Sequence, residues 1–308
     1  MKKQKENDFH IIIECGQTKI MIVVRLTGGL GNQMFQYAAG KSLSYLHNTI
    51  LSFDTSYFNN QKLRQYSLST FNIQQHFIAP TRIKVIRPPF FEVKKFFHDQ
   101  SSHKKTSIFL LYKENSFTYD TNFNKQPSNT YLDGYWQSEK YFTNIEHIIR
   151  QDLTFNNIPD SKNLQLINKI ESSNSISIHI RRGDYVSSKQ ANEYHGTCGI
   201  SYYNEAIKKM STTIIEPHFF AFSDEPAWAH ENIKTDYPLT IIDHNESEHE
   251  DLRLMSLCKH NIIANSTFSW WAAWLNNNKS KIVIAPAKWF RATELSTQDL
   301  IPNSWIQL

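Results

Sequence analysis

A cluster of three glycines limits the folds open to this chain more than any other feature. The chain holds only 9 glycines in 308 residues, and three of them, Gly28, Gly29 and Gly31, fall close together. Glycine lets the backbone bend sharply or approach another group closely, because it has no Cβ atom. The cluster follows an apolar, β-branched stretch at 21–26 and precedes helically spaced apolar residues at 32–46. This order predicts a strand, a tight turn and a helix.

The rest of the chain continues the alternation of strands and helices. A second strand at 49–53 completes a β-α-β unit, which requires a parallel sheet. Further strands are expected at 131–136, 175–180, 218–222, 261–264 and 281–285, and helices at 138–150, 201–210, 225–232, 251–258 and 268–275. We therefore expect the α/β class, with a parallel sheet in each half of the chain.

A polar stretch at 156–163 predicts the junction between two domains. The expected division is an N-terminal extension at 1–20, an N-terminal domain at 21–155 and a C-terminal domain at 156–308. Residues 57–130 lack a clear pattern, and we expect them to form an irregular cap on the first domain. A mixture of aromatic and basic residues at 87–97 leaves open a resting place on a membrane surface, although the cap is the favoured interpretation.

Charge and cysteine content exclude several other classes of protein. The chain has 33 Lys and Arg residues and 29 Asp and Glu residues. The resulting formal net charge of +4 is smaller than the strongly positive charge typical of nucleic-acid-binding proteins. Three cysteines without a C-x-x-C motif indicate neither a disulfide framework nor a zinc site. Because no apolar run reaches the length of a transmembrane helix, we expect a cytoplasmic protein, with peripheral contact at the inner membrane left open.

Unusual polar clusters follow four of the expected strands. They lie at 28–33, 179–185, 223–225 and 265–269. Ligands of open parallel sheets bind beyond the carboxyl ends of the strands, so two facing sheets would bring these clusters together. The sequence therefore predicts one site in the cleft.

The glycine cluster has three interpretations. In the first, the glycines begin a helix whose free N–H groups bind a phosphate. In the second, they belong to the dinucleotide site of an NAD(P)-dependent oxidoreductase, in which Asp54 lies at a suitable spacing to bind the ribose. Against that alternative, Met34 stands where the dinucleotide fingerprint has a small third residue. A glycine turn without any ligand is the third interpretation.

The other clusters combine donors that suit an anion. The guanidinium groups of Arg181 and Arg182 match phosphate oxygens, unless one of them forms an ion pair with Asp184. Ser266 and Thr267 begin a helix, where hydroxyl and N–H groups can bind phosphate or simply cap the helix. Asp224 can bind a ribose or a base edge, or cap the helix after Pro226. The tryptophans at 270, 271 and 274 are interpreted as helix core rather than as a platform for a sugar.

The order of these motifs resembles the bacterial α-1,2-fucosyltransferases, glycosyltransferase family 11. Similar stretches lie at 25–37, 134–139, 179–185, 223–225, 250–256 and 261–271, so the resemblance covers about 21–289. It implies a GT-B fold, in which two Rossmann-like domains face each other with GDP-fucose in the cleft. The acceptor it implies is a terminal galactose on an oligosaccharide or O-antigen unit. A carbohydrate-binding protein without catalytic activity is the remaining alternative.

The resemblance also assigns roles to individual residues. Arg181 would hold the diphosphate, His179 would lie near the guanine or ribose, and Asn32 would close on the diphosphate from the opposite domain. Asp251 matches a stretch that reaches the guanine, and Ser266, Thr267 and Phe268 would line the phosphate and nucleoside side. The full set of substrate-binding residues that we expect is Gly31, Asn32, Gln33, His179, Arg182, Asp224, Asp251, Ser266, Thr267 and Phe268.

The implied reaction is an inverting transfer with GDP as the leaving group. Because no convincing Asp-x-Asp ends a strand, we expect no metal and no cofactor, with GDP-fucose as a co-substrate. The expected catalytic residues are Arg181, Asp184 and His195. Asp184 is the first candidate for the general base and His195 the second, with Glu193 and Asp224 as further candidates. Asp184 orienting an arginine is a nearly equal alternative.

Overall fold

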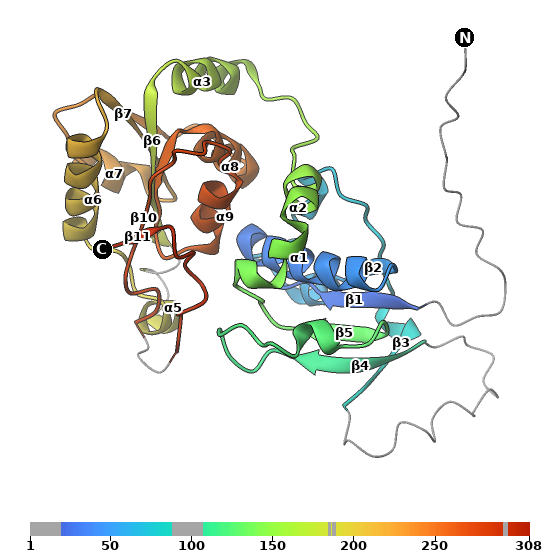
Figure 1. The fold of residues 1–308 in the computed structure, drawn as a ribbon. Helices are drawn as coiled ribbons and strands as arrows, with labels where there is room; N and C mark the ends of the chain where they lie inside the picture. Colours follow the sequence, from blue (N-terminus) through green and yellow to red (C-terminus); the bar gives the residue numbers. More distant parts are fainter. Residues whose placement is uncertain (1–19, 88–106, 184–185, 187–188, 292–294) are drawn as a thin grey trace, which may run out of the picture.

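The N-terminal half of the chain builds a five-stranded parallel sheet (Figure 1). The computed structural model describes residues 20–87, 107–183, 186, 189–291 and 295–308. The strands run in the order β2-β1-β5-β4-β3, and every pair is parallel. They are β1 (Met21–Arg25), β2 (Ile50–Asp54), β3 (Ile83–Ile86), β4 (Ser107–Lys113) and β5 (Thr130–Asp133). The helices are α1 (Leu30–Leu46) and α2 (Glu146–Asp152).

The C-terminal half builds a six-stranded parallel sheet in the order β11-β10-β9-β6-β7-β8. Its strands are β6 (Asn174–Ile180), β7 (Pro217–Ser223), β8 (Leu239–Ile242), β9 (His260–Ile262), β10 (Val283–Ala285) and β11 (Ile306–Gln307). Its helices are α3 (Ser161–Glu171), α5 (Lys189–Tyr194), α6 (Ile200–Thr213), α7 (Pro226–Asn232), α8 (Glu248–Leu257) and α9 (Thr267–Leu275). The expectation of an α/β chain with two facing parallel sheets, as in a GT-B fold, is confirmed.

Aromatic side chains join the two halves between α1 and α9, which face each other in Figure 1. The ring centroid of Phe35 lies 4.4 Å from that of Trp270 and 5.0 Å from that of Trp271. On the other side of this contact, Phe142 stacks on Trp271 at 5.4 Å. All four side chains are completely or almost completely buried. The interpretation of Trp270 and Trp271 as core is therefore confirmed, and this core is continuous across both sheets.

Several elements differ from the expectations. Residues 57–130 supply β3 and β4 of the first sheet, so the expectation of an irregular cap is wrong there. Both strands lack a clean alternation of buried and exposed residues, and β3 is an exposed edge strand, which explains why no pattern marked them. The expected helix at 138–150 consists of 3₁₀ turns at Glu139–Tyr141 and Thr143–Ile145 followed by α2.

The predicted domain junction at 155/156 falls between α2 and α3. Part of the polar stretch at 156–163 belongs to α3, whose N-cap Asp160 accepts a hydrogen bond from the backbone N–H of Asn163 at 2.8 Å. The extension at 1–20 and the aromatic and basic stretch at 87–97 lie almost wholly outside the described residues. Within the described part of the chain, none of the helices combines the length and apolarity that crossing a membrane requires.

Candidate active site

A cavity of about 520 Å³ lies between the carboxyl ends of the two sheets. Ten of the expected substrate-binding and catalytic residues line it, and they come from both halves of the chain. They are Gly31, Asn32, His179, Arg181, His195, Asp224, Asp251, Ser266, Thr267 and Phe268. The structure thus brings together the four clusters that the sequence places at strand ends.

The glycine loop forms the wall that belongs to the first sheet. Gly28 has a φ of +75°, a left-handed conformation that favours glycine. Gly29 is the N-cap of α1 and offers no capping side chain. At Gly31, an added Cβ atom would lie 2.5 Å from the backbone nitrogen of Phe268, at the start of α9. Glycine is therefore required at position 31 because the starts of two helices, one from each half, meet there.

Asn32 connects the two walls of the cavity. Its Oδ1 accepts hydrogen bonds from Nε2 of Gln137 and from Oγ1 of Thr267, both at 3.0 Å. These two donors determine the orientation of the amide, because only its oxygen can accept them. The Nδ2 group of Asn32 therefore faces away from them and can donate to an anion.

The start of α9 lies opposite this loop. Ser266 is the N-cap, and its Oγ accepts a hydrogen bond from the backbone N–H of Phe268 at 3.3 Å. The capping interpretation therefore holds for Ser266, which lines the cavity as well. Because the helix start concentrates partial positive charge, this wall suits an anionic ligand even where the hydroxyl is engaged.

Arg181 and Arg182 separate into two roles directly after β6. The guanidinium of Arg181 lies in the cavity wall, with Nη1 3.0 Å from Oδ2 of Asp224. Arg182 is not part of that wall: its Nε donates to Oε2 of Glu225 at 3.0 Å and its guanidinium covers the ring of Trp228. Both arginines therefore form ion pairs, Arg181 with Asp224 and Arg182 with Glu225, whereas Asp184, the partner considered from the sequence, lies outside the described residues. Asp224 also accepts the backbone N–H of Arg182 at 2.9 Å, which holds the strand end in place.

His179 is buried in the cavity wall at the end of β6. Its ring centroid lies 5.5 Å from that of Phe268, and only 5% of the residue is exposed. Burial, with a smaller effect of Arg181, lowers the pKa of His179 to about 3, so the ring is neutral at physiological pH. The neutral imidazole therefore adds no positive charge beside Arg181.

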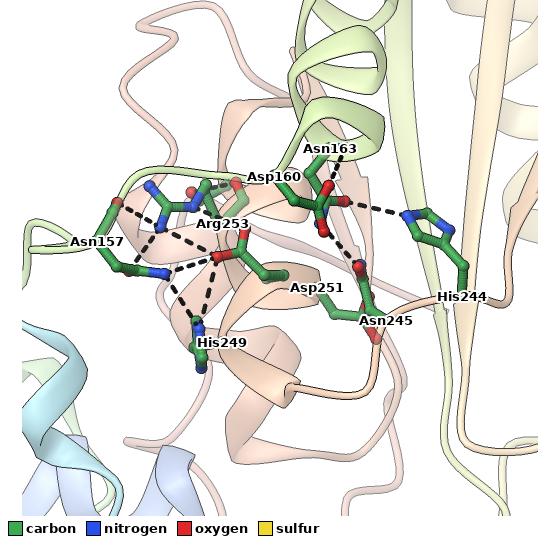
Figure 2. A network of polar contacts seen from close by, with 10 residues as sticks. Asn157, Asp160, Asn163, His244, Asn245, His249, Asp251 and Arg253 are labelled. Carbon is green, nitrogen blue, oxygen red and sulfur yellow. Dashed lines mark hydrogen bonds and ion pairs between the residues drawn. The ribbon is translucent and has the colours of Figure 1, made fainter.

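Asp251 lies in the acidic wall of the cavity, with Glu246 and Glu248 nearby. Its Oδ1 accepts a hydrogen bond from Nδ2 of Asn245 at 2.7 Å, and Nδ2 of Asn163 in turn donates to Oδ1 of Asn245 at 2.9 Å (Figure 2). Burial, and then repulsion from Glu250 and Glu248, raise the pKa of Asp251 to about 6, although the Asn245 bond lowers it. The start of α3 thus helps to orient a carboxylate that lines the cavity.

A second group of polar contacts, also drawn in Figure 2, holds the segment before α3 against α8. Oε1 of Glu250 accepts from Nδ2 of Asn157 at 2.9 Å, and Oε2 of Glu250 accepts from Nε of Arg253 at 3.0 Å. Nη2 of Arg253 also donates to Oδ1 of Asn157 at 2.7 Å. These contacts tie the connection between the two halves to the helix that carries Asp251.

Three residues singled out in the sequence, Gln33, Met34 and Asp54, lie outside the cavity wall. Gln33 is completely buried outside the cavity wall, and its side chain bonds to the backbone of Gly28 and of residues 65 and 67. Asp54 is 5% exposed; its oxygens accept from Oη of Tyr131 and from the backbone N–H of Ser56. Asp54 is therefore engaged in the sheet and is not placed to bind a ribose. Met34 is buried in the core.

The structure describes three of the four candidates for the general base. Asp184 lies outside the described residues. His195 lines the cavity, where its ring centroid is 5.6 Å from that of Phe290. Glu193 is exposed on α5 and does not line the cavity. Asp224 lines it but is engaged with Arg181.

Several lining residues carried no signal in the sequence. They are Tyr57, Arg64, Phe117, Tyr135, Gln137, Tyr194, Asn245, Glu246, Glu248, Trp289 and Phe290. Most come from irregular segments, whose position depends on contacts with distant parts of the chain. Tyr135 and Gln137 are exceptions: both lie in the stretch 134–139, whose resemblance to a family motif could have identified them.

A partly buried carboxylate shapes the turn that carries Tyr135 and Gln137. Glu114 accepts the backbone N–H groups of Tyr135 at 2.7 Å and of Trp136 at 2.9 Å. Trp136 has a φ of +57°, and an added Cβ at Gly134 would collide with Glu114. Burial raises the pKa of Glu114 to about 7, although the two N–H groups lower it.

No group of three or more His, Cys, Asp or Glu side chains within the described ranges is arranged to hold a metal ion. A cavity between two facing parallel sheets, with an arginine on one wall and a glycine loop on the other, is the arrangement of a GT-B-like glycosyltransferase. The chain belongs to glycosyl transferase family 11, whose model matches residues 21–308. The resemblance inferred from the motifs is thereby confirmed.

Individual relatives agree with this membership. The chain is 36% identical over 296 residues to the alpha-1,2-colitosyltransferase of Escherichia coli, covering 94% of this chain and 99% of the relative. It is 34% identical over 306 residues to the O-antigen biosynthesis glycosyltransferase WbnK of Escherichia coli, covering 92% and 99%. Among solved structures, the fucosyltransferase NodZ from Bradyrhizobium is 15% identical with a TM-score of 0.47, covering 83% of this chain and 93% of that chain.

Proposed function

We propose that the protein transfers L-fucose from GDP-fucose to the 2-hydroxyl of a terminal galactose, forming an α-1,2 linkage on an oligosaccharide or O-antigen unit. The observation that carries the proposal is Arg181, which directly follows β6 and lies in a cavity whose opposite wall is the glycine loop. The names of the two Escherichia coli relatives support an α-1,2 linkage and an O-antigen acceptor.

The charges of the cavity suit the two ends of GDP. Arg181 and the starts of α1 and α9 would bind the diphosphate, because guanidinium and free N–H groups donate to phosphate oxygens. The amide Nδ2 of Asn32 adds a donor from the opposite wall. Asp251 would accept the two neighbouring N–H donors of guanine. His179, a neutral ring, would lie beside the nucleoside.

In the proposed step, the oxygen of the galactose 2-hydroxyl attacks the anomeric carbon of fucose. A new C–O bond forms as the bond between that carbon and the β-phosphate oxygen breaks, and the configuration inverts. GDP carries away the electron pair, so negative charge grows on the β-phosphate, where Arg181 stabilises it. The hydroxyl proton passes to a general base, for which His195 and Asp184 remain the candidates.

We propose that this charge is stabilised without a metal or a cofactor. Arginine and the helix starts supply the electrostatic stabilisation that a divalent ion supplies in other glycosyltransferases. Activity should persist in excess EDTA. Loss of activity that Mn²⁺ or Mg²⁺ restores would contradict this part of the proposal.

The function is tested by incubating the protein with GDP-fucose and a galactose-terminated oligosaccharide, followed by linkage analysis of the product. GDP should raise the melting temperature, since a ligand that binds only the folded state stabilises it. Stabilisation by NADH but not by GDP would favour an oxidoreductase, and glycan binding without transfer would favour a binding protein.

Colitose is a second candidate for the transferred sugar, because one relative is named as a colitosyltransferase. Colitose lacks the 3-hydroxyl of fucose, so competition between GDP-fucose and GDP-colitose separates the two donors.

We further propose that the reaction takes place in the cytoplasm. Cys198 and Cys258 are buried free thiols, which suits a reducing compartment. Flotation with vesicles of anionic lipid would test peripheral contact with the inner membrane.

A further inference from the structure

Arg64 lies in the wall of the cavity that Arg181 also lines, but it belongs to the other half of the chain. It follows the 3₁₀ turn at Ser56–Asn60, in a segment without a sequence pattern. An added Cβ atom on Gly29 would lie 3.8 Å from Nη1 of Arg64. The guanidinium therefore lies beside the glycine loop.

Gln33 attaches this segment to the glycine loop. Its Nε2 donates to the carbonyl oxygen of Gly28 at 3.0 Å and to that of Gln65 at 2.9 Å. Its Oε1 accepts the backbone N–H of Ser67 at 2.9 Å. The side chain of Gln33 is completely buried, so this junction is rigid, and Arg64 directly precedes the attached residues.

The start of α1 adds partial positive charge beside Arg64. The first turn of α1 contains no acidic residue, and its N-cap Gly29 makes no side-chain capping bond. An anion bound between the guanidinium and the helix start would interact favourably with both. The cavity at this point is where the proposed function places a diphosphate.

We propose that Arg64 is a second diphosphate-binding residue, which contacts the β-phosphate of GDP-fucose, and that Gln33 is the residue that positions it. The inference rests on the proposed function. Arg181, Ser266 and Asp251 all belong to the C-terminal half, which would hold the nucleoside and one side of the diphosphate. A guanidinium from the N-terminal half would then contact the β-phosphate from the opposite side to Arg181. As the bond to the sugar breaks, Arg64 stabilises the charge that appears on that phosphate.

Binding of GDP and GMP to the full-length protein tests the position of Arg64, because GMP lacks the β-phosphate. We expect Arg64→Ala to weaken the binding of GDP about 10- to 100-fold, as for loss of a charge-assisted hydrogen bond, and to leave GMP binding nearly unchanged. Arg64→Lys should restore part of the loss, since it keeps the charge but not the planar fork. Lys62→Ala is the matched control, because it removes an exposed cation two residues away that does not line the cavity.

Three results would overturn the inference: wild-type affinity of Arg64→Ala for GDP, an equal loss for GDP and GMP, or the same loss in Lys62→Ala. If the wild-type protein binds GDP but Arg64→Ala changes nothing, only this inference fails. If the wild-type protein binds neither nucleotide, the proposed function fails with it.

The role of Gln33 is tested by its effect through Arg64. Gln33→Ala should reduce the preference for GDP over GMP, and combining it with Arg64→Ala should add no further loss of preference. An additive loss of preference would contradict a positioning role. Gln33→Glu keeps the acceptor for Ser67 but loses the two donated bonds, so it gives the same comparison if the alanine variant does not fold. Both variants should lower kcat with GDP-fucose, as Arg64→Ala does.

Discussion

Substitution of Gly31 by alanine should separate the two halves of the protein at the starts of α1 and α9. The added Cβ would lie 2.5 Å from the backbone nitrogen of Phe268 and 2.5 Å from the carbonyl carbon of Thr267. Ordinary contacts between such atoms are about 3.5–4.0 Å, so the two helix starts must move apart by about 1 Å. The two atoms that the added Cβ would meet belong to the backbone, so they cannot move aside as the end of a flexible side chain could.

The expected cost follows from the contacts that this movement disturbs. The hydrogen bond from Thr267 to Asn32 is 3.0 Å long, and about 1 Å more would break it. Overpacking costs about 1–3 kcal/mol and the lost bond about 1 kcal/mol, so we expect a destabilisation of about 2–4 kcal/mol. The melting temperature should fall on the order of 5–10 °C. Because Asn32 would shift relative to Arg181, kcat/KM with GDP-fucose should fall about 10²-fold.

Gly29→Ala provides the matched control for stability. Gly29 has φ −78° and ψ 176°, which alanine adopts readily, and its added Cβ would meet only Arg64 at an ordinary 3.8 Å. Thermal unfolding of the two variants, with steady-state kinetics of Gly31→Ala, gives the comparison. A melting temperature for Gly31→Ala within about 1 °C of Gly29→Ala would refute the close contact between the helix starts.

Three further predictions concern the donor site and the core. Arg181→Lys keeps the charge but loses the fork, and kcat/KM should fall by about 10²–10³; unchanged kinetics would remove Arg181 from the mechanism. The KM for GDP-fucose should rise as the pH falls through about 6, the raised pKa of Asp251, because the protonated carboxyl accepts guanine poorly; Asp251→Asn should lose this dependence. Trp271→Ala should reduce the free energy of unfolding in urea by about 3–5 kcal/mol, and a smaller loss would contradict a shared core.

Much of the fold and part of the site could be predicted from local patterns. The strand and helix on either side of Gly28 and the buried strand before Arg181 show periodic apolar residues, and parallel strands bring their carboxyl ends to one edge. Strands β3 and β4 escaped prediction because their burial does not alternate. The positions of Arg64 and Asn245 also escaped it, since irregular segments have no periodicity that marks a contact with distant residues.

The sequence by itself established the alternation of strands and helices through its apolar periodicity, and the family through the order of its motifs. Only the tertiary structure decided whether a polar residue of a motif faces the cavity or the protein interior, because this depends on how distant segments pack. Gln33 and Asn32 are neighbours in the chain, yet Gln33 turns inward to hold residues 65 and 67 while Asn32 lines the cavity. The reason is geometric: adjacent residues on a helix point about 100° apart, and the surrounding segments determine which direction is buried.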